Sequence, residues 1–266
     1  MCIAAWAWRA HPLYPLILFF NRDEYLNRPT EAVSWWEEPE ILGGKDGIGG
    51  GTWLACSKDG RFAFLTNVLE VDQLPLAKTR GQLPVRFLQS ENSPLEFAEE
   101  VAEEALQYKG FNLVLVDLHT ETMVYVTNRP SGEAVTIKKV SPGLHVLSNA
   151  SLDTLWPKAN RLRKNFKKLL RQYGKEEIHQ IKFLDQLMLD TTRADRENLP
   201  NTGCDSDWEL GLSSIFVDTQ TKQGRLCTRS MIALCVKANS EVNLYERYLE
   251  EGIWKEHSTF YFINST

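Results

Sequence analysis

The chain opens on Cys2-Ile3-Ala4-Ala5-Trp6-Ala7-Trp8, an apolar run that predicts a strand at the start of the sequence. Removal of Met1 would make Cys2 the first residue, which would then carry both a thiol that attacks carbonyls and a free α-amine. An unperturbed α-amine has a pKa of about 7.7 to 8.0 and accepts the thiol proton near neutral pH. We therefore expect Cys2 to act as a nucleophile without a histidine, although a cysteine in a strand is by default a small buried residue.

Patterns along the rest of the chain predict strands, a helix, more strands, two helices and a final group of strands. The strands are expected at residues 2–8, 14–20, 52–56, 61–66, 112–118, 123–128, 134–140, 144–148, 213–217, 226–236, 242–248 and 258–263. The helices are expected at residues 93–108, 156–173 and 176–189, the first with Ser93 as N-cap and Glu96 closing a capping box. Strands joined by hairpins, with helices inserted between them, predict an α+β fold over a single domain, residues 1–266.

Two segments rich in turn residues are expected to be loops. Residues 43–51 hold six glycines in nine positions, but no G-x-x-x-x-G-K pattern follows, so they are predicted as a flexible loop over a site and not as a phosphate cradle. Residues 190–212 are polar and contain proline and glycine, which predicts a long surface loop.

Composition excludes several classes of protein. A net charge of −5 over 266 residues gives no electrostatic reason to bind nucleic acid. The five cysteines are scattered, so we expect a reducing compartment. The five histidines show no H-x-x-x-H arrangement, so we expect no metal site. We also expect no cofactor. No signal peptide or membrane-spanning stretch is evident, which predicts a cytoplasmic protein.

A tetrapeptide at the end of the second predicted strand, Asn21-Arg22-Asp23-Glu24, resembles the signature of the NRDE family, the transport-and-Golgi-organisation proteins. Other segments match family landmarks in family order: Met1-Cys2-Ile3, Asn27-Arg28-Pro29, Gly50-Gly51-Thr52-Trp53-Leu54, Leu65-Thr66-Asn67, Gly110-Phe111-Asn112-Leu113, Leu147-Ser148-Asn149-Ala150 and Thr228-Arg229-Ser230. This resemblance implies an N-terminal nucleophile hydrolase-like fold, a four-layer αββα sandwich of two antiparallel sheets between helical layers.

The resemblance also implies roles for individual residues. Asp23 matches the aspartate that holds the terminal amine and the thiol of Cys2 in register. Asn67 and Asn149 match asparagines whose amides stabilise an oxyanion. Arg229 matches an arginine kept near the nucleophile, where its charge lowers the thiol pKa. Taken singly, aspartate and asparagine at strand ends are more often turn residues, and an arginine within a strand more often faces solvent.

Arg22 marks a departure from the pattern of the related amidases, which have an arginine a few residues before the aspartate. Along an extended strand, Asn21 and Asp23 face one way, whereas Arg22 and Glu24 face the other. We therefore expect either that Arg22 substitutes for the missing arginine through a bend, or that the amidase machinery is incomplete.

Two classes of function follow. The first is a hydrolase of a small amide or thioester that uses Cys2, Asp23 and the two asparagines. The second, implied by family members in haem trafficking and lipid homeostasis, is a carrier or chaperone of haem or acyl-CoA that binds without cleaving, in association with mitochondria or the Golgi. Basic residues on the predicted helix 156–173 suit either a peripheral membrane contact or an ordinary solvated face. The oligomeric state is left open.

Overall fold

The structure, a computed structural model, describes residues 1–71 and 77–264. The chain divides into two compact units. The first unit comprises Met1–Asn27, Pro142–Ser148 and Leu152–Phe262, and the second comprises Arg28–Ser141, Asn149–Ser151 and Ile263–Thr266. The prediction of a single domain over residues 1–266 stays a prediction.

The first unit is built on an antiparallel sheet. Its strand order is β10-β1-β2-β12-β13-β14, with β11 paired to β12. The strands are β1 (Cys2–Trp8), β2 (Leu16–Tyr25), β10 (Gly143–Leu147), β11 (Asp218–Thr221), β12 (Gly224–Val236), β13 (Glu241–Glu250) and β14 (Ile253–Phe262). Strand β1 lies between β2 and β10, so the start of the chain is held in the interior of the sheet and not at its edge.

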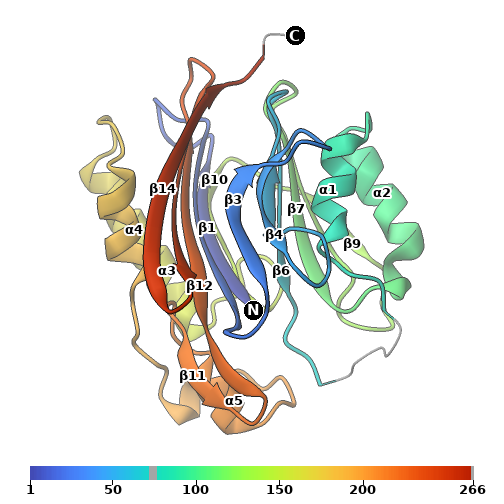
Figure 1. The fold of residues 1–266 in the computed structure, drawn as a ribbon, viewed down its shortest axis with the longest axis vertical. Helices are drawn as coiled ribbons and strands as arrows, with labels where there is room; N and C mark the ends of the chain where they lie inside the picture. The colour runs from blue at the N-terminus through green and yellow to red at the C-terminus, as the bar shows by residue number, and fades with distance from the viewer. Residues whose placement is uncertain (72–76, 265–266) are drawn as a thin grey trace. The chain divides into compact units, whose positions relative to one another are not determined.

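Helices cover one face of this sheet. Helices α3 (Pro157–Gln172) and α4 (Gln180–Met188) pack against β1, β2, β10 and β12 and lie along one side of them in Figure 1. Alternate residues of β1, among them Ile3 and Ala5, form one core with Phe166 of α3 and Phe183 of α4. A 3-10 turn, η2 (Arg196–Asn198), and helix α5 (Ser206–Gly211) lie between α4 and β11 along the chain.

The second unit is built on another antiparallel sheet, whose strand order β3-β4-β5-β6-β7-β8-β9 follows the chain. The strands are β3 (Thr30–Trp35), β4 (Leu42–Asp46), β5 (Leu54–Cys56), β6 (Arg61–Asn67), β7 (Phe111–Asp117), β8 (Thr122–Thr127) and β9 (Thr136–Lys139). Gly60 turns the chain from β5 into β6 with a φ of +82°, a conformation that glycine adopts without strain.

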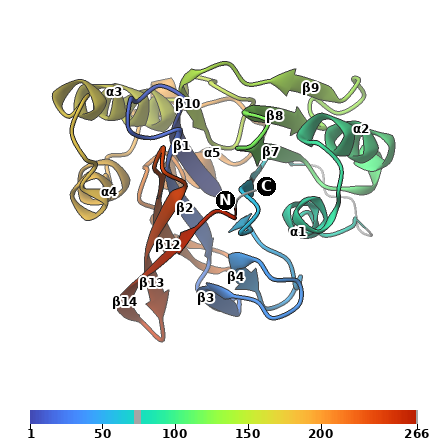
Figure 2. The ribbon, with the colours of Figure 1, turned by 90° about the horizontal axis from the view of Figure 1, so that it is seen from above.

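Helices α1 (Gln82–Gln89) and α2 (Pro94–Glu104), the latter followed by the 3-10 turn η1 (Ala105–Gln107), pack against β5 to β9 of this sheet, and Figure 2 shows them beside β7 and β8. The capping box predicted at Ser93 and Glu96 is present at the start of α2. Together the two units confirm the predicted α+β fold of two antiparallel sheets with helices.

Some predicted elements are wrong. The predicted flexible loop 43–51 begins with residues of strand β4, and a Cβ on Gly44 would lie 2.2 Å from the Trp53 ring. These first glycines therefore serve close packing and not flexibility. Residues 213–217 form no strand; the strand in that region is β11, which begins at Asp218. The predicted loop 190–212 contains η2 and α5, and strand β3 and helix α1 were not predicted.

Candidate active site

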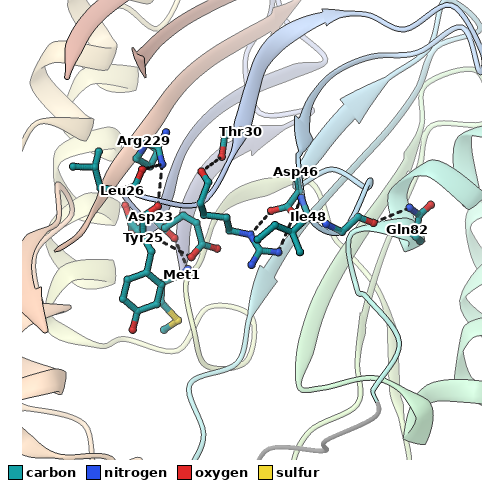
Figure 3. A network of polar contacts seen from close by, with 12 residues as sticks. Met1, Asp23, Tyr25, Leu26, Thr30, Asp46, Ile48, Gln82 and Arg229 are labelled. Carbon is teal, nitrogen blue, oxygen red and sulfur yellow. Dashed lines mark hydrogen bonds and ion pairs between the residues drawn. The ribbon is translucent and has the colours of Figure 1, made fainter. Parts of the chain in front are cut away.

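The register between β1 and β2 places the signature tetrapeptide directly beside the start of the chain. Cys2 is the cross-strand partner of Arg22. One residue further out, the Met1 ammonium donates to the Asp23 carbonyl at 2.5 Å, and the Asp23 N–H donates to the Met1 carbonyl at 2.6 Å. Figure 3 shows Met1 and Asp23 side by side. The residue that precedes Cys2 is therefore held by the backbone of Asp23.

Arg22 lies on the same face of the sheet as Cys2, because cross-strand partners share a face. Asn21 and Asp23 take the opposite face. No bend in β2 is needed, because β2 stays in register with β1 from Leu16 to Arg22. The irregularity lies instead in β12, where Thr228 pairs with Asp23, Ser230 pairs with Arg22 and Arg229 is the extra residue of a bulge.

Asn21 has a structural role that the sequence did not reveal. Its side chain is fully buried, and its amide nitrogen donates to the carbonyls of Met188 at 2.9 Å and Ile215 at 3.0 Å. These carbonyls belong to the end of α4 and to the segment before β11. The first residue of the tetrapeptide thus ties two distant segments to β2.

Asp23 is a buried carboxyl group with one oxygen engaged and one open. Its Oδ1 accepts a hydrogen bond of 2.7 Å from Thr228, whereas Oδ2 has no hydrogen-bond donor among the described residues. Burial raises the pKa of Asp23 to about 6, although the positive charges of Lys158 and of the N-terminus oppose the rise. The carboxyl group is therefore mostly ionised at neutral pH but close to titrating.

This pKa makes Asp23 a pH-dependent contributor to stability. The pKa of Asp23 is about 6 in the folded state and exceeds the ordinary value of 3.8. The stabilisation that this carboxyl group gives the fold is therefore fully present below the ordinary pKa of 3.8, and it is lost as the pH rises through about 6. We expect Asp23→Asn to remove this dependence, which amounts to up to about 3 kcal/mol in the free energy of unfolding between about pH 4 and pH 7. Urea denaturation of both proteins across that range measures it, and a difference that does not change with pH would contradict it.

The Cys2 thiol is also buried, with 4% of the residue exposed. Burial raises the pKa of Cys2, while the N-terminal ammonium, Arg22 and the Asp23 backbone act in the opposite direction. The thiol is therefore protonated at neutral pH and requires a base to become a nucleophile. Ser148, which follows β10, donates to the Cys2 carbonyl at 3.3 Å and fixes the strand from its other side.

Arg229 binds backbone carbonyl groups. Its Nη1 donates to the carbonyls of Tyr25 and Leu26, both at 2.9 Å, and Figure 3 shows this contact at the end of β2. These contacts hold the chain where it leaves the sheet. The predicted role of Arg229 as a positive charge for the nucleophile stays a prediction.

Asn67 and Asn149 lie together within the second unit. The Asn149 amide donates to the backbone carbonyl of Asn67 at 2.9 Å, and its own backbone carbonyl accepts from Leu69 at 3.0 Å. Asn149 is buried, with 1% exposed. The two residues are therefore brought together, while their role as oxyanion donors stays a prediction.

Lys158, in the first turn of α3, is a buried residue that the sequence analysis placed on the surface of its helix. It was grouped with the basic residues of this helix, of which Lys164, Lys168 and Arg171 are indeed exposed. Lys158 itself is only 3% exposed, so its assignment to a surface face was wrong. A signal was present in the sequence, because a lysine directly after the proline that starts a helix lies where the helix dipole disfavours a cation.

Within 1–71 and 77–264, no three histidine, cysteine or acidic side chains are grouped so that they could hold a metal ion. Over the same residues, no helix combines the length and the apolar character needed to cross a membrane. All five cysteines are free thiols.

Comparison with known proteins gives matches over most of the chain. The model of the family described as Transport and Golgi organisation 2 matches residues 1–251. A Transport and Golgi organization 2 homolog of Mus musculus is 32% identical over 265 residues, or 93% of this chain and 92% of the mouse protein. The Drosophila melanogaster Transport and Golgi organization protein 2 is 24% identical over 232 residues, or 82% of each chain. These matches confirm the resemblance found in the sequence.

Among solved structures, a mutant conjugated bile acid hydrolase from Clostridium perfringens is similar to this chain with a TM-score of 0.53. The similarity covers 99% of this chain and 97% of the hydrolase at 10% sequence identity. The two proteins therefore share a fold.

Proposed function

We propose, from the premise that this chain belongs to the Transport and Golgi organisation 2 family, that it is a hydrolase of a small amide or thioester with Cys2 as its nucleophile. Processing ahead of Cys2 would expose the α-amine that serves as the base. The shared fold with a hydrolase supports the class of reaction, and the residues around Cys2 support the mechanism.

The observation that carries the proposal is the arrangement of Asp23 around the residue that precedes Cys2. The backbone N–H and carbonyl of Asp23 both bond to Met1, and its Oδ2 has no donor among the described residues. Removal of Met1 would take away the partner of both backbone groups of Asp23, directly ahead of the new amine of Cys2. An ammonium group there would be stabilised by the carboxylate and the carbonyl of Asp23.

The reaction then follows from the chemistry of this residue pair. The α-amine takes the thiol proton, and the thiolate of Cys2 attacks the carbonyl carbon of the substrate. Collapse of the tetrahedral intermediate breaks the bond to the amine or thiol leaving group, which takes the proton from the ammonium. Water then attacks the thioester on Cys2, releases the carboxylic acid and restores the thiol. Arg22, on the same face as Cys2, lowers the thiol pKa and stabilises the thiolate.

Mass spectrometry of the intact protein with a panel of amide and thioester substrates tests the proposal. We expect the native protein to lack Met1 and to gain the mass of one acyl group on Cys2 during turnover. A matched protein that keeps one additional residue ahead of Cys2 is expected to form no adduct and to turn over no substrate. In that protein the backbone nitrogen of Cys2 is in a peptide bond and cannot accept the thiol proton. Ligand binding without cleavage by the processed protein would reject the hydrolase and favour a carrier.

A further inference from the structure

The last strand, β14, forms one edge of the sheet in the first unit. Among the described strands it pairs only with β13, and Figure 2 shows it as the outermost strand, beyond β13. All ten residues of β14 pair with β13 in a continuous register, without a bulge. The other side of such an edge presents a row of backbone N–H and carbonyl groups that can pair with a further strand.

The edge has little of the protection that exposed edge strands usually carry, which is proline, a bulge or outward-pointing charge. It contains no proline, and its two formally charged residues, Lys255 and Glu256, both contact β13. Lys255 forms an ion pair with Glu250, whereas Glu256 accepts a hydrogen bond from the Tyr245 hydroxyl and lies 3.7 Å from Arg247. The charged side chains are therefore held by β13 and do not block approach to the open side of β14.

Three aromatic side chains lie on one face of β14. Trp254, Phe260 and Phe262 share this face, because alternate residues of a strand point the same way. Phe260 is 56% exposed and Phe262 is 53% exposed, and their ring centroids lie 5.1 Å apart in an edge-to-face arrangement. The Trp254 ring lies 6.0 Å from that of Phe216 and is also partly exposed. Exposed aromatic side chains grouped along an open edge indicate an interaction surface.

The sequence of β14 is complementary to itself. When two copies of the strand pair antiparallel about a two-fold axis at Ser258, residues equally far before and after Ser258 lie opposite each other. Trp254 then faces Phe262 of the second copy, and the same contact is repeated on the other side of the axis. Cross-strand aromatic pairs of this kind stabilise a sheet beyond the burial of their area.

Electrostatics favours this register over its neighbours. An axis at Glu256 would place two carboxylates opposite each other, and an axis at Lys255 would place two ammonium groups opposite each other, which destabilises a strand pair. With the axis at Ser258, Glu256 faces Phe260 of the second copy and Lys255 faces Tyr261. No like charges then lie directly opposite each other along the strand.

We propose that two copies of this chain associate through β14, antiparallel and in register about Ser258, so that their two seven-stranded sheets become one continuous sheet. The interface is isologous, because each copy contributes the same strand. A single pair of strands buries little surface, so we expect a dimer with a Kd in the micromolar range. This association does not depend on the proposed hydrolase activity.

Sedimentation equilibrium of the full chain, combined with hydrogen exchange, tests the proposal without a substitution. We expect the dimer to form as the protein concentration rises through the micromolar range, and the amides of residues 253–262 to exchange more slowly over the same range. A protein that remains monomeric up to about 200 µM overturns the proposal. So does a dimer that leaves exchange in β14 unchanged, or protection of β14 only by a chain of different sequence.

Two substitutions of opposite charge at Phe260 test the register. Phe260→Glu places a carboxylate opposite Glu256 of the second copy, twice in each dimer, and should weaken association by about 10-fold or more. Phe260→Lys places an ammonium group opposite the same carboxylate and should keep the association constant within about threefold. Leu106→Glu, at an exposed apolar position of η1 in the second unit, is the matched control and should leave association unchanged.

The outcomes of this comparison are decisive in both directions. Loss of the dimer in Phe260→Glu with retention in Phe260→Lys supports the register, whereas equal effects of the two charges, or no effect of Phe260→Glu, overturn it. Because Phe260 is more than half exposed, both variants are expected to fold, which circular dichroism checks. Should either fail to fold, hydrogen exchange in the unmodified protein still decides.

Discussion

Replacement of Cys2 by serine or alanine is expected to reduce turnover of amides and thioesters by on the order of 10⁴-fold or more, as removal of a nucleophile does in other hydrolases. Alanine offers no nucleophile, and a serine hydroxyl ionises far less readily than a thiol beside the same weak base. Because Cys2 is small and lies on a strand held by two neighbours, the free energy of unfolding should change by only about 1 kcal/mol. Steady-state kinetics with the substrate panel and thermal denaturation measure the two quantities.

Cys204→Ser is the matched control for this experiment. Cys204 is another free thiol, partly exposed in the segment before α5, where its backbone N–H donates to the Thr202 hydroxyl. Its replacement should leave turnover unchanged. Full activity of Cys2→Ala, or equal losses in both variants, would remove Cys2 from the mechanism.

Asn21→Ala is expected to produce the largest loss of stability, about 3 kcal/mol in the free energy of unfolding. The substitution removes two buried hydrogen bonds, at 2.9 and 3.0 Å, and leaves the carbonyls of Met188 and Ile215 without this donor. Each buried acceptor that loses its partner costs about 1 to 3 kcal/mol. Urea denaturation at fixed pH measures the change through the transition midpoint.

An exposed asparagine on α3, Asn165, is the matched control for this variant. Asn165→Ala should change the free energy of unfolding by less than about 0.5 kcal/mol. Equal effects of the two substitutions would show that the buried amide of Asn21 does not stabilise the fold. The expected contrast assigns a structural role to the first residue of the tetrapeptide.

Local patterns in the sequence predicted the elements whose causes are local. The apolar run at residues 2–8 forms β1, and the capping residues Ser93 and Glu96 start α2. The glycine-rich segment 43–51 misled the prediction, because glycine is equally suited to a flexible loop and to a strand packed closely on its neighbours. Which of the two applies depends on Trp53 and Ala55, which pack against Gly44 and Gly43.

The sequence by itself determined the α+β class and the family, because strand alternation, helix caps and the tetrapeptide depend on neighbouring positions. Only the tertiary structure decided that Asn21 binds carbonyls 167 and 194 residues away, and that the side chain of Lys158 is buried. Burial and electrostatic interactions arise from the packing of distant segments, and a pattern of neighbouring residues does not contain them.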